Sequence, residues 1–293
     1  MGNVLNPKFD LHVHTTASDG SLDAMQIIAE AKRIGLKTIA ITDHDTIGNL
    51  KLCIEEGAKN GIRVIPGVEM SAEVSSGKMH ILGFGINPDD EEFNKVMEML
   101  REARMTRNLN IIETLNVGFD IHITFDDVKK HAKGQTIGKP HIAAAIVDYG
   151  YASNVQDAFD KYLNSKKLDK IDRKKLPPKS CIELINKAGG IAVLAHPTSL
   201  KLSDDDLFKK FKELKNYGLV GIEAYHSNIS SKKSEIYKKM ATELGLVISC
   251  GSDFHGLDIK NDVELGRGKA DNIPTNDESI VKGIIEAIEN NKK

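Results

Sequence analysis

Short apolar stretches alternate with amphipathic helical patterns along most of this chain of 293 residues. Strand patterns over 8–14 and 37–42 are each followed by a helical pattern, over 22–33 and 50–59. The same alternation returns at residue 191 and continues to a closing helical pattern over 277–289. Because parallel strands need crossover connections, usually helices, this order predicts a parallel sheet or barrel.

A hairpin and a long helical stretch interrupt this order. Residues 75–78 read Ser-Ser-Gly-Lys between two strand patterns, which predicts a hairpin turn. Residues 89–165 carry helical patterns almost throughout, and 166–179 combine seven Lys or Arg, two Asp and a Pro-Pro pair, as in a linker or surface loop. We therefore expect one α/β protein. Residues 1–86 and 180–293 would form a β/α barrel, and residues 87–179 a helical insertion, or cap.

The composition is that of an ordinary globular protein, with 40% apolar and 28% charged residues. No stretch approaches the roughly 20 apolar residues that span a bilayer, and no leader precedes the first strand pattern, so we expect a cytoplasmic protein. A net charge of −2 gives no general attraction for nucleic acid, and we expect no DNA-binding module. Cys53, Cys181 and Cys250 lie far apart in apolar patterns, which indicates buried thiols rather than disulfides.

Histidines and carboxylates gather where strand patterns end. His12 and His14 are two residues apart on a strand, so their side chains leave the same face. His44, His196 and Asp253 each follow a strand pattern. The carboxyl ends of parallel strands share one face, where active sites are built, so these groups are expected to meet. The nine candidate metal ligands are His12, His14, Asp19, His44, Glu69, His80, His196, Asp253 and His255.

These nine side chains offer imidazole and carboxylate donors without a thiolate. Such donors suit Zn, Mn or Fe in hydrolytic sites rather than a structural zinc site. Nine candidates exceed the needs of one ion, so two or three ions with at least one bridging carboxylate fit the count. Asp43 and Asp45 flank His44, and we expect them to orient imidazoles rather than to bind metal. His226 ends the strand pattern at 221–226 and is expected to be a substrate contact or a general acid.

Five motifs resemble those of the PHP (polymerase and histidinol phosphatase) superfamily. They are Asp-Leu-His-Val-His-Thr-Thr-Ala-Ser-Asp-Gly at 10–20, Ile-Thr-Asp-His-Asp at 41–45, Gly-Val-Glu at 67–69, Leu-Ala-His-Pro at 194–197 and Gly-Ser-Asp-Phe-His at 251–255. The length and the insertion resemble the branch of nucleoside 3′,5′-bisphosphate phosphatases and 5′→3′ exoribonucleases, metal-dependent phosphoesterases of the TrpH type. The resemblance implies a distorted seven-stranded, TIM-like β/α barrel with three divalent ions, usually Mn²⁺ and otherwise Zn²⁺ or Fe²⁺.

The resemblance also distributes the nine ligands over the three ions. His12, His14, Glu69 and Asp253 would hold one ion. Glu69, His80 and His196 would hold a second, and Asp19, His44 and His255 a third. Two such ions activate a bridging hydroxide for attack at phosphorus, and here that hydroxide would be held beside Glu69 and Asp253.

Phosphate recognition needs cations beyond the metal ions, and the predicted cap supplies them. Arg104 and Arg107 are three residues apart and so share one helix face. Lys139 and His141 stand in Gly-Lys-Pro-His at 138–141, where a turn opens a helix whose N-terminus favours anions. This turn and a cap arginine resemble the groups that grip the second phosphate of a nucleotide in the family branch; the alternative is that they are solvated surface charges. The Lys-rich stretch 166–175 is interpreted as a solvated loop, or else as a basic rim for an RNA tail.

We therefore expect a metal-dependent phosphoesterase that hydrolyses phosphate esters of small nucleotides, either 3′,5′-bisphosphates or the 5′ ends of short RNA. Aromatic residues make up only 5% of the chain, with no Trp, which favours a mononucleotide or a chain end over long single strands. Two alternatives stay open. One is a histidinol-phosphate phosphatase, which would need an acidic pocket, and the other is a non-catalytic, metal-binding regulatory module. The sequence predicts no oligomeric state.

Overall fold

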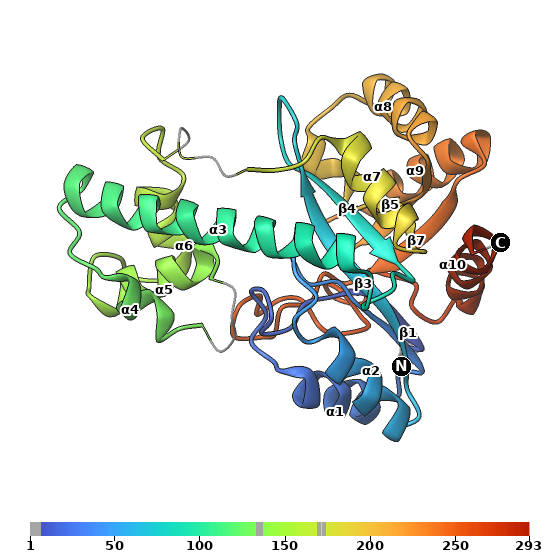
Figure 1. The fold of residues 1–293 in the computed structure, drawn as a ribbon, viewed down its shortest axis with the longest axis horizontal. Coiled ribbons are helices and arrows are strands. Elements are labelled where there is room, and N and C mark those ends of the chain that lie inside the picture. The colour runs from blue at the N-terminus through green and yellow to red at the C-terminus, as the bar shows by residue number, and fades with distance from the viewer. Residues whose placement is uncertain (1–6, 133–136, 169–170, 172–173, 293) are drawn as a thin grey trace.

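The computed structural model describes residues 7–132, 137–168, 171 and 174–292. Seven strands form one sheet in chain order (Figure 1). They are β1 (Phe9–Val13), β2 (Thr38–Ile41), β3 (Arg63–Ala72), β4 (Met79–Phe84), β5 (Ile191–Leu194), β6 (Leu219–His226) and β7 (Val247–Gly251). Neighbouring strands are parallel except for β3–β4 and β4–β5, which are antiparallel.

Main-chain hydrogen bonds between β1 and the segment after β7 nearly close the sheet. The amide of Asp253 donates to the carbonyl oxygen of His12 at 2.9 Å, and the amide of His14 donates to the carbonyl oxygen of Phe254 at 2.9 Å. The sheet is thus a distorted, near-closed barrel of seven strands, and the predicted fold class is confirmed. The antiparallel β3–β4 pair confirms the turn predicted at 75–78.

Amphipathic helices pack against the barrel. They are α1 (Ala24–Ile34), α2 (Leu50–Lys59), α7 (Pro178–Lys187), α8 (Asp204–Asn216), α9 (Ser231–Leu244) and α10 (Glu278–Asn291). α1 begins after Asp23, whose carboxylate accepts the amide of Gln26 at 2.9 Å, and it ends at Gly35, where φ is 85°. α7 was not expected from the sequence, because a Lys-rich stretch and a Pro-Pro pair precede it. Pro178 stands in the first turn of α7, where a missing amide costs nothing.

The residues inserted between β4 and β5 form a helical unit beside the barrel (Figure 1). Its elements are α3 (Glu91–Gly118), α4 (Phe125–Lys129), α5 (Lys139–Asp148), α6 (Val155–Ala158) and the π-helical turn η1 (Phe159–Leu163). Phe93 and Leu100 of α3 belong to the apolar core around the barrel, whereas Ile111 and Leu115 of the same helix belong to a separate apolar cluster of the cap. α3 is therefore shared by both units, and the boundaries at 86/87 and 179/180 stay a prediction.

The cysteines confirm the prediction of buried thiols, since Cys53, Cys181 and Cys250 are buried and free. Burial raises the pKa of each thiol above its usual range, so none of them is a nucleophile at neutral pH. Among the helices of the described residues, none is long and apolar enough to cross a bilayer.

Candidate metal centre

All nine predicted ligands lie together at one end of the barrel. β1 supplies His12 and ends just before His14. His44 and His196 follow β2 and β5, and Glu69 lies within β3. The remaining four are Asp19 after β1, His80 at the start of β4, and Asp253 and His255 after β7. The strand ends thus bring side chains from most of the chain length to one place.

Glu69 stands at the centre of this group, and its side chain is fully buried. The imidazole nitrogens within 3.4 Å of its Oε2 are those of His12, His14 and His44. The imidazole nitrogens at 2.8 Å from its Oε1 are those of His80 and His196. One carboxylate therefore faces two sets of imidazoles with its two oxygens, an arrangement that suits a bridging ligand.

The candidate ligands form groups whose donor atoms all lie within 4.8 Å of one another. One group contains His12, His14, Glu69 and Asp253; a second contains His44, Glu69 and His80; a third contains His14, Asp19, His44 and His255. The first group equals one of the three ligand sets that the family resemblance implies, and the third group adds His14 to another. The second group contains His44 where the resemblance places His196. His196 joins the second group through its contact with Glu69.

Buried donor atoms without hydrogen-bond partners belong to these groups. In the described part of the chain they include Nε2 of His12 and His14, Nδ1 of His44, Oδ1 of Asp19 and Oε2 of Glu69. A buried polar atom that lacks a partner costs free energy and calls for an explanation. Divalent ions bound between these atoms would satisfy them, so the residues fit a cluster of metal ions.

Opposite charges set the protonation states within the centre. Burial would raise the pKa of Glu69, but the surrounding imidazoles hold it well below its usual range. Burial would lower the pKa of His12, whereas the carboxylates of Glu223, Glu69 and Asp253 outweigh burial and raise it well above normal. Burial dominates at His80 and lowers its pKa to about 4. His80 is thus a neutral donor at neutral pH, and His12 must lose a proton to bind a metal ion.

Glu223 of β6 forms hydrogen bonds with two of the histidines, a role that was not predicted from the sequence. Nδ1 of His12 donates to Oε1 of Glu223 at 2.9 Å, which leaves Nε2 of His12 facing Glu69. Oε2 of Glu223 accepts the amide of His196 at 2.7 Å. A signal was present in the sequence, because a carboxylate inside an apolar strand pattern is costly without a partner.

His226, the predicted acid or substrate contact, lies at the edge of the centre. Its Nδ1 accepts the amide of Asn228 at 2.9 Å, so the proton of the neutral ring sits on Nε2. Nε2 is 3.4 Å from Oδ2 of Asp253. The donor atoms of His12, Glu223 and His226 also lie within 4.8 Å of one another.

Asp43 holds a loop rather than an imidazole ring, which differs from its predicted role. Its carboxylate accepts the amide and the hydroxyl of Thr15 and the hydroxyl of Ser18, at 2.6–2.8 Å. The hydroxyl of Ser18 lies 3.4 Å from Nδ1 of His14. Any effect of Asp43 on His14 therefore passes through the loop that follows β1.

Asp45 also differs from the prediction that it orients imidazoles. It accepts the amide of Ser71 at 2.8 Å and a hydrogen bond from Nη2 of Arg104 at 2.7 Å. A φ of 53° places Asp45 in the left-handed region and turns its side chain toward β3 and the cap. Asp45 thus joins the loop after β2 to α3.

A cleft of about 300 Å³ opens beside the histidines, between the barrel and the cap. The candidate ligands that line it are Asp19, His44 and His80. The predicted cap cations that line it are Arg104, Arg107 and Lys139. Candidate metal ligands and phosphate-binding cations therefore face the same space.

The predicted phosphate-binding residues differ in their local contacts. Nζ of Lys139 donates to the carbonyl oxygen of Leu163 at 2.9 Å, and Nη2 of Arg107 donates to Oδ1 of Asn108 at 2.8 Å. His141 is buried, and its Nδ1 accepts the amide of Gly138 at 3.0 Å, so it caps the first turn of α5. Burial lowers the pKa of His141, which keeps the ring neutral.

Further residues that line the cleft include Lys78, Phe159 and Lys175. Lys175 belongs to the Lys-rich stretch that was interpreted as a solvated loop or a basic rim. Lys167 of the same stretch donates to the carbonyl oxygen of Gly118 at 2.7 Å. Residues 169, 170, 172 and 173 of that stretch lie outside the described residues.

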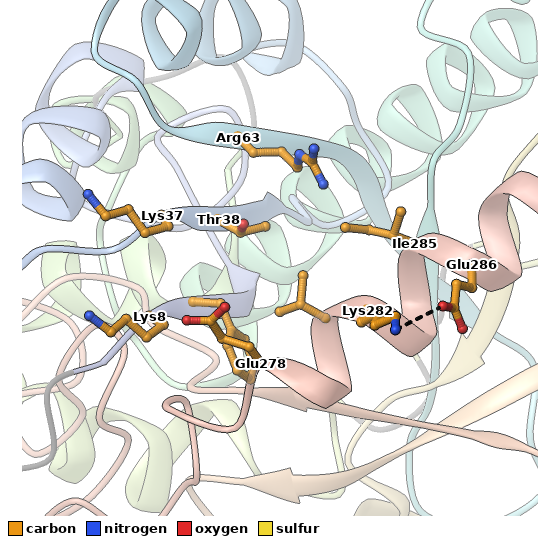
Figure 2. Close-up of a pocket in the computed structure, with 10 residues that line it drawn as sticks. Lys8, Lys37, Thr38, Arg63, Glu278, Lys282, Ile285 and Glu286 are labelled. Atoms are coloured by element: carbon orange, nitrogen blue, oxygen red, sulfur yellow. Dashed lines mark ion pairs between the residues drawn. The ribbon is translucent and has the colours of Figure 1, made fainter.

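A larger cavity of about 410 Å³ lies at the opposite end of the strands (Figure 2). Lys8, Lys37 and Arg63, at the amino-terminal ends of β1, β2 and β3, line it together with Glu278 and Ile285 of α10. Enzymes with β/α barrels place their active sites at the carboxyl ends of the strands. The smaller cleft beside the histidines is therefore the candidate active site.

Residues 10–170 match the family model described as the PHP domain. The chain belongs to the PHP domain family. A 5′-3′ exoribonuclease from Haemophilus influenzae is 30% identical to this PHP protein over 251 residues, which are 86% of this chain and 91% of that protein. A 3′,5′-nucleoside bisphosphate phosphatase from Chromobacterium violaceum is 29% identical over 247 residues, which are 84% of this chain and 86% of that protein.

The fold of the PHP protein matches a solved structure over almost its whole length. A protein from Bifidobacterium adolescentis, described as a metal-dependent phosphoesterase, superposes with a TM-score of 0.82 and 29% identity, covering 95% of this chain and 96% of that one. Together with the cluster of metal-binding side chains, these relatives identify the PHP protein as a metal-dependent phosphoesterase, which confirms the expected class of enzyme. They favour neither a histidinol-phosphate phosphatase nor a regulatory module.

Proposed function

We propose that this PHP protein hydrolyses phosphate esters of small nucleotides, with 3′,5′-nucleoside bisphosphates as the favoured substrates. One observation carries the proposal: cations of the cap and candidate metal ligands of the barrel line the same cleft. A bisphosphate offers one phosphate for hydrolysis at the metal ions and a second for the cations. The relative from Chromobacterium violaceum is named for such a substrate.

Three divalent ions would occupy the three groups of ligands, with Mn²⁺ favoured and Zn²⁺ or Fe²⁺ as alternatives. The imidazole and carboxylate donors of the groups support ions of this kind. When bound, such ions lower the pKa of a shared water and neutralise charge on the phosphoryl group. Glu69 and Asp253 each turn one oxygen toward His12 and His14, and in the proposal they orient the attacking water.

His226 is the proposed proton donor. The alkoxide that leaves as the ester P–O bond breaks needs a proton, which an imidazolium ring can supply while it becomes a neutral imidazole. In the structure Nδ1 of His226 accepts the amide of Asn228, so the neutral ring directs Nε2–H toward Asp253 and the centre and donates a hydrogen bond there. Proton transfer from Nε2 requires that Nδ1 is protonated as well and releases the amide of Asn228. A contact between His226 and the substrate is the alternative role.

Arg104, Arg107 and Lys139 would hold the second phosphate. Asp45 anchors Nη2 of Arg104, while Nε of Arg104 has no hydrogen-bond partner within the described residues. A guanidinium group fixed in this way can bind phosphate through its remaining donors. Lys139 is the first residue of α5, where the helix N-terminus favours an anion. His141, which caps that turn, would act by shaping it.

The 5′ end of a short RNA is a second candidate substrate. Two more cations, Lys78 on the β3–β4 hairpin and Lys175 between η1 and α7, also line the cleft and would contact the phosphates of following nucleotides. The relative from Haemophilus influenzae is named as an exoribonuclease. Histidinol phosphate carries an amine, which the cations of the cleft would repel, and it is not proposed. A cytoplasmic location stays a prediction.

Steady-state kinetics with Mn²⁺-loaded protein tests the proposal. We compare kcat/KM for adenosine 3′,5′-bisphosphate, a 5′-phosphorylated dinucleotide and histidinol phosphate. We expect the bisphosphate to have the highest value, and activity to disappear on chelation and in the His12→Ala and Asp253→Ala variants. His122→Ala is the matched control, because His122 is an exposed histidine of the cap. Full activity after exhaustive chelation, or a preference for histidinol phosphate, would contradict the proposal; a preference for the dinucleotide would select the second candidate.

A further inference from the structure

Lys260, in the loop between β7 and α10, stands beside the candidate metal centre and has no role in the function proposed above. We infer that Lys260 is a positioning residue that fixes the carboxylate of Asp253, so that one oxygen of Asp253 is directed at the metal ions. This inference rests on the proposed metal centre. Neither the motifs of the chain nor its strand pattern singled out Lys260.

The two oxygens of Asp253 have separate partners. Oδ1 lies 3.2 Å from Nε2 of His14 and 3.5 Å from Nε2 of His12, on the side of the candidate ions. Oδ2 accepts a hydrogen bond from Nζ of Lys260 at 2.6 Å. Nζ also donates to the main-chain oxygen of Asp253, at 3.2 Å. The lysine thus holds both the side chain and the backbone of one candidate ligand.

The loop around Lys260 is itself fixed. The amide of Lys260 donates to the carbonyl oxygen of Gly256 at 2.9 Å. Gly256 has a φ of 96°, and a Cβ there would lie 1.9 Å from Oγ of Ser21, so only glycine fits. The side chain of Lys260 is 31% exposed and that of Asp253 is 13% exposed. The ammonium group is therefore partly shielded from water, where an ion pair is stronger than at the surface.

Lys260 also differs in kind from the other cationic partners of the carboxylates in the candidate metal centre. Within the described part of the chain, every other ion-pair partner of Asp19, Glu69, Glu223 and Asp253 is a histidine. A histidine that binds a metal ion gives up its proton, whereas a lysine that binds no metal keeps its charge. Lys260 would therefore continue to hold Oδ2 of Asp253 after the ions have bound.

The position of Lys260 favours a role in metal binding rather than in binding the second phosphate. The cleft between barrel and cap is lined by Arg104, Arg107 and Lys139, and Lys260 is not among the described residues that line it. Loss of Lys260 should therefore weaken metal binding and leave KM for the bisphosphate nearly unchanged. Residues that orient a metal ligand contribute about 10–100-fold to metal affinity.

Titration calorimetry of chelator-stripped, full-length protein with Mn²⁺ tests the inference. The variants are Lys260→Met, Lys260→Gln and Lys260→Arg, with Lys269→Met as the matched control. Lys269 forms an ion pair with Asp262 at 2.9 Å nearby but touches none of the candidate ligands. We expect Lys260→Met and Lys260→Gln to weaken Mn²⁺ binding at one site by about 10–100-fold. We expect Lys260→Arg to retain most of the affinity and Lys269→Met all of it.

Two results would overturn the inference. The first is a wild-type affinity for Mn²⁺ in a folded Lys260→Met or Lys260→Gln variant. The second is a raised KM for the bisphosphate with unchanged Mn²⁺ binding, which would make Lys260 a substrate contact. Failure of the wild-type protein to bind Mn²⁺ at all would overturn the metal centre itself, so the two failures are distinguishable. Circular dichroism of each metal-free variant reports whether it is folded.

Discussion

Arg104 and Asp45 form a buried ion pair of 2.7 Å between the middle of α3 and the loop that follows β2. Both side chains are almost inaccessible to water, at 7% and 1% exposure. Asp45 lies one residue after the candidate ligand His44, and Ser71, which donates its amide to Asp45, lies two residues after Glu69. A cap residue is thus tied directly to the chain segments that present two metal ligands.

Replacing Arg104 by Met should destabilise the protein by about 3 kcal/mol, because it leaves the carboxylate of Asp45 buried without its cation. KM for the bisphosphate should rise as well. Urea unfolding and steady-state kinetics measure the two effects. The control is Arg101→Met, which removes an exposed pair with Glu98 on the same helix and should cost less than about 1 kcal/mol. Equal losses of unfolding free energy in both variants would contradict the role of the buried ion pair.

Replacing Glu223 by Gln should lower Mn²⁺ affinity by about 10–100-fold, because the carboxylate that orients His12 becomes a neutral amide. Titration calorimetry measures the change. Glu243→Gln, at an exposed position of α9, provides the comparison and should bind Mn²⁺ like the wild type. Unchanged affinity in Glu223→Gln would show that His12 does not depend on this hydrogen bond.

The stability of the metal-free protein should depend on pH through the titration of His12. Its pKa in the folded protein is raised well above the ordinary 6.5, since three carboxylates outweigh burial. Its contribution to stability is therefore fully present below about pH 6.5 and is lost as the pH rises through the folded-state pKa. We expect Tm of the metal-free protein to fall with rising pH above neutrality, and to fall less steeply in His12→Asn. A slope that is unchanged in His12→Asn would assign the titration to another group.

Replacing Lys139 by Met should lower kcat/KM for the bisphosphate by about 10–100-fold. The reason is the loss of a hydrogen bond to a charged phosphate, which contributes roughly 1.5–3 kcal/mol. The monophosphate of the same nucleoside that keeps only the hydrolysed phosphate should show a smaller loss of kcat/KM, because it lacks the second phosphate. Parallel assays of the two substrates measure this difference. Lys129→Met, at an exposed position of α4, serves as the control. An equal loss for both substrates would place Lys139 at the phosphate that is hydrolysed.

Replacing Gly251 by Ala should destabilise the protein by about 3 kcal/mol or more, because a Cβ at this position would lie 2.2 Å from Cβ of His12. Gly283→Ala offers a contrast, since a Cβ there meets nothing within 4 Å and the position is inside α10. That variant should gain about 0.5–1 kcal/mol. Thermal unfolding of both variants tests the pair. A stable Gly251→Ala that still binds Mn²⁺ would show that β1 and β7 can separate at this point.

The sequence predicted the parts of the fold and site that repeat with a regular period. The spacing of His12 and His14 on a strand, and the strand pattern before His44, follow from backbone geometry that any strand shares. Glu69 could be placed at a strand and recognised from a motif, but its central position depends on how six other strands curve around it. Local patterns carry no information of that kind.

The contacts that could not be predicted from the sequence link residues far apart in the chain. Glu223 is 211 positions from His12, and Arg104 is 59 positions from Asp45. Asp43 and Asp45 were expected to orient imidazoles because they flank His44, yet the loop turns their carboxylates toward Thr15, Ser71 and Arg104. Such choices are made by tertiary packing rather than by neighbours in sequence.

The sharing of α3 between the two apolar clusters limits how the protein can be divided. Cutting the chain at 86/87 would remove Phe93, Met97 and Leu100 from the core around the barrel. The same helix carries Ile111 and Leu115 into the core of the cap. Unfolding of the cap therefore removes apolar side chains of α3 from the core around the barrel. The two units should then unfold in a single cooperative transition rather than in succession.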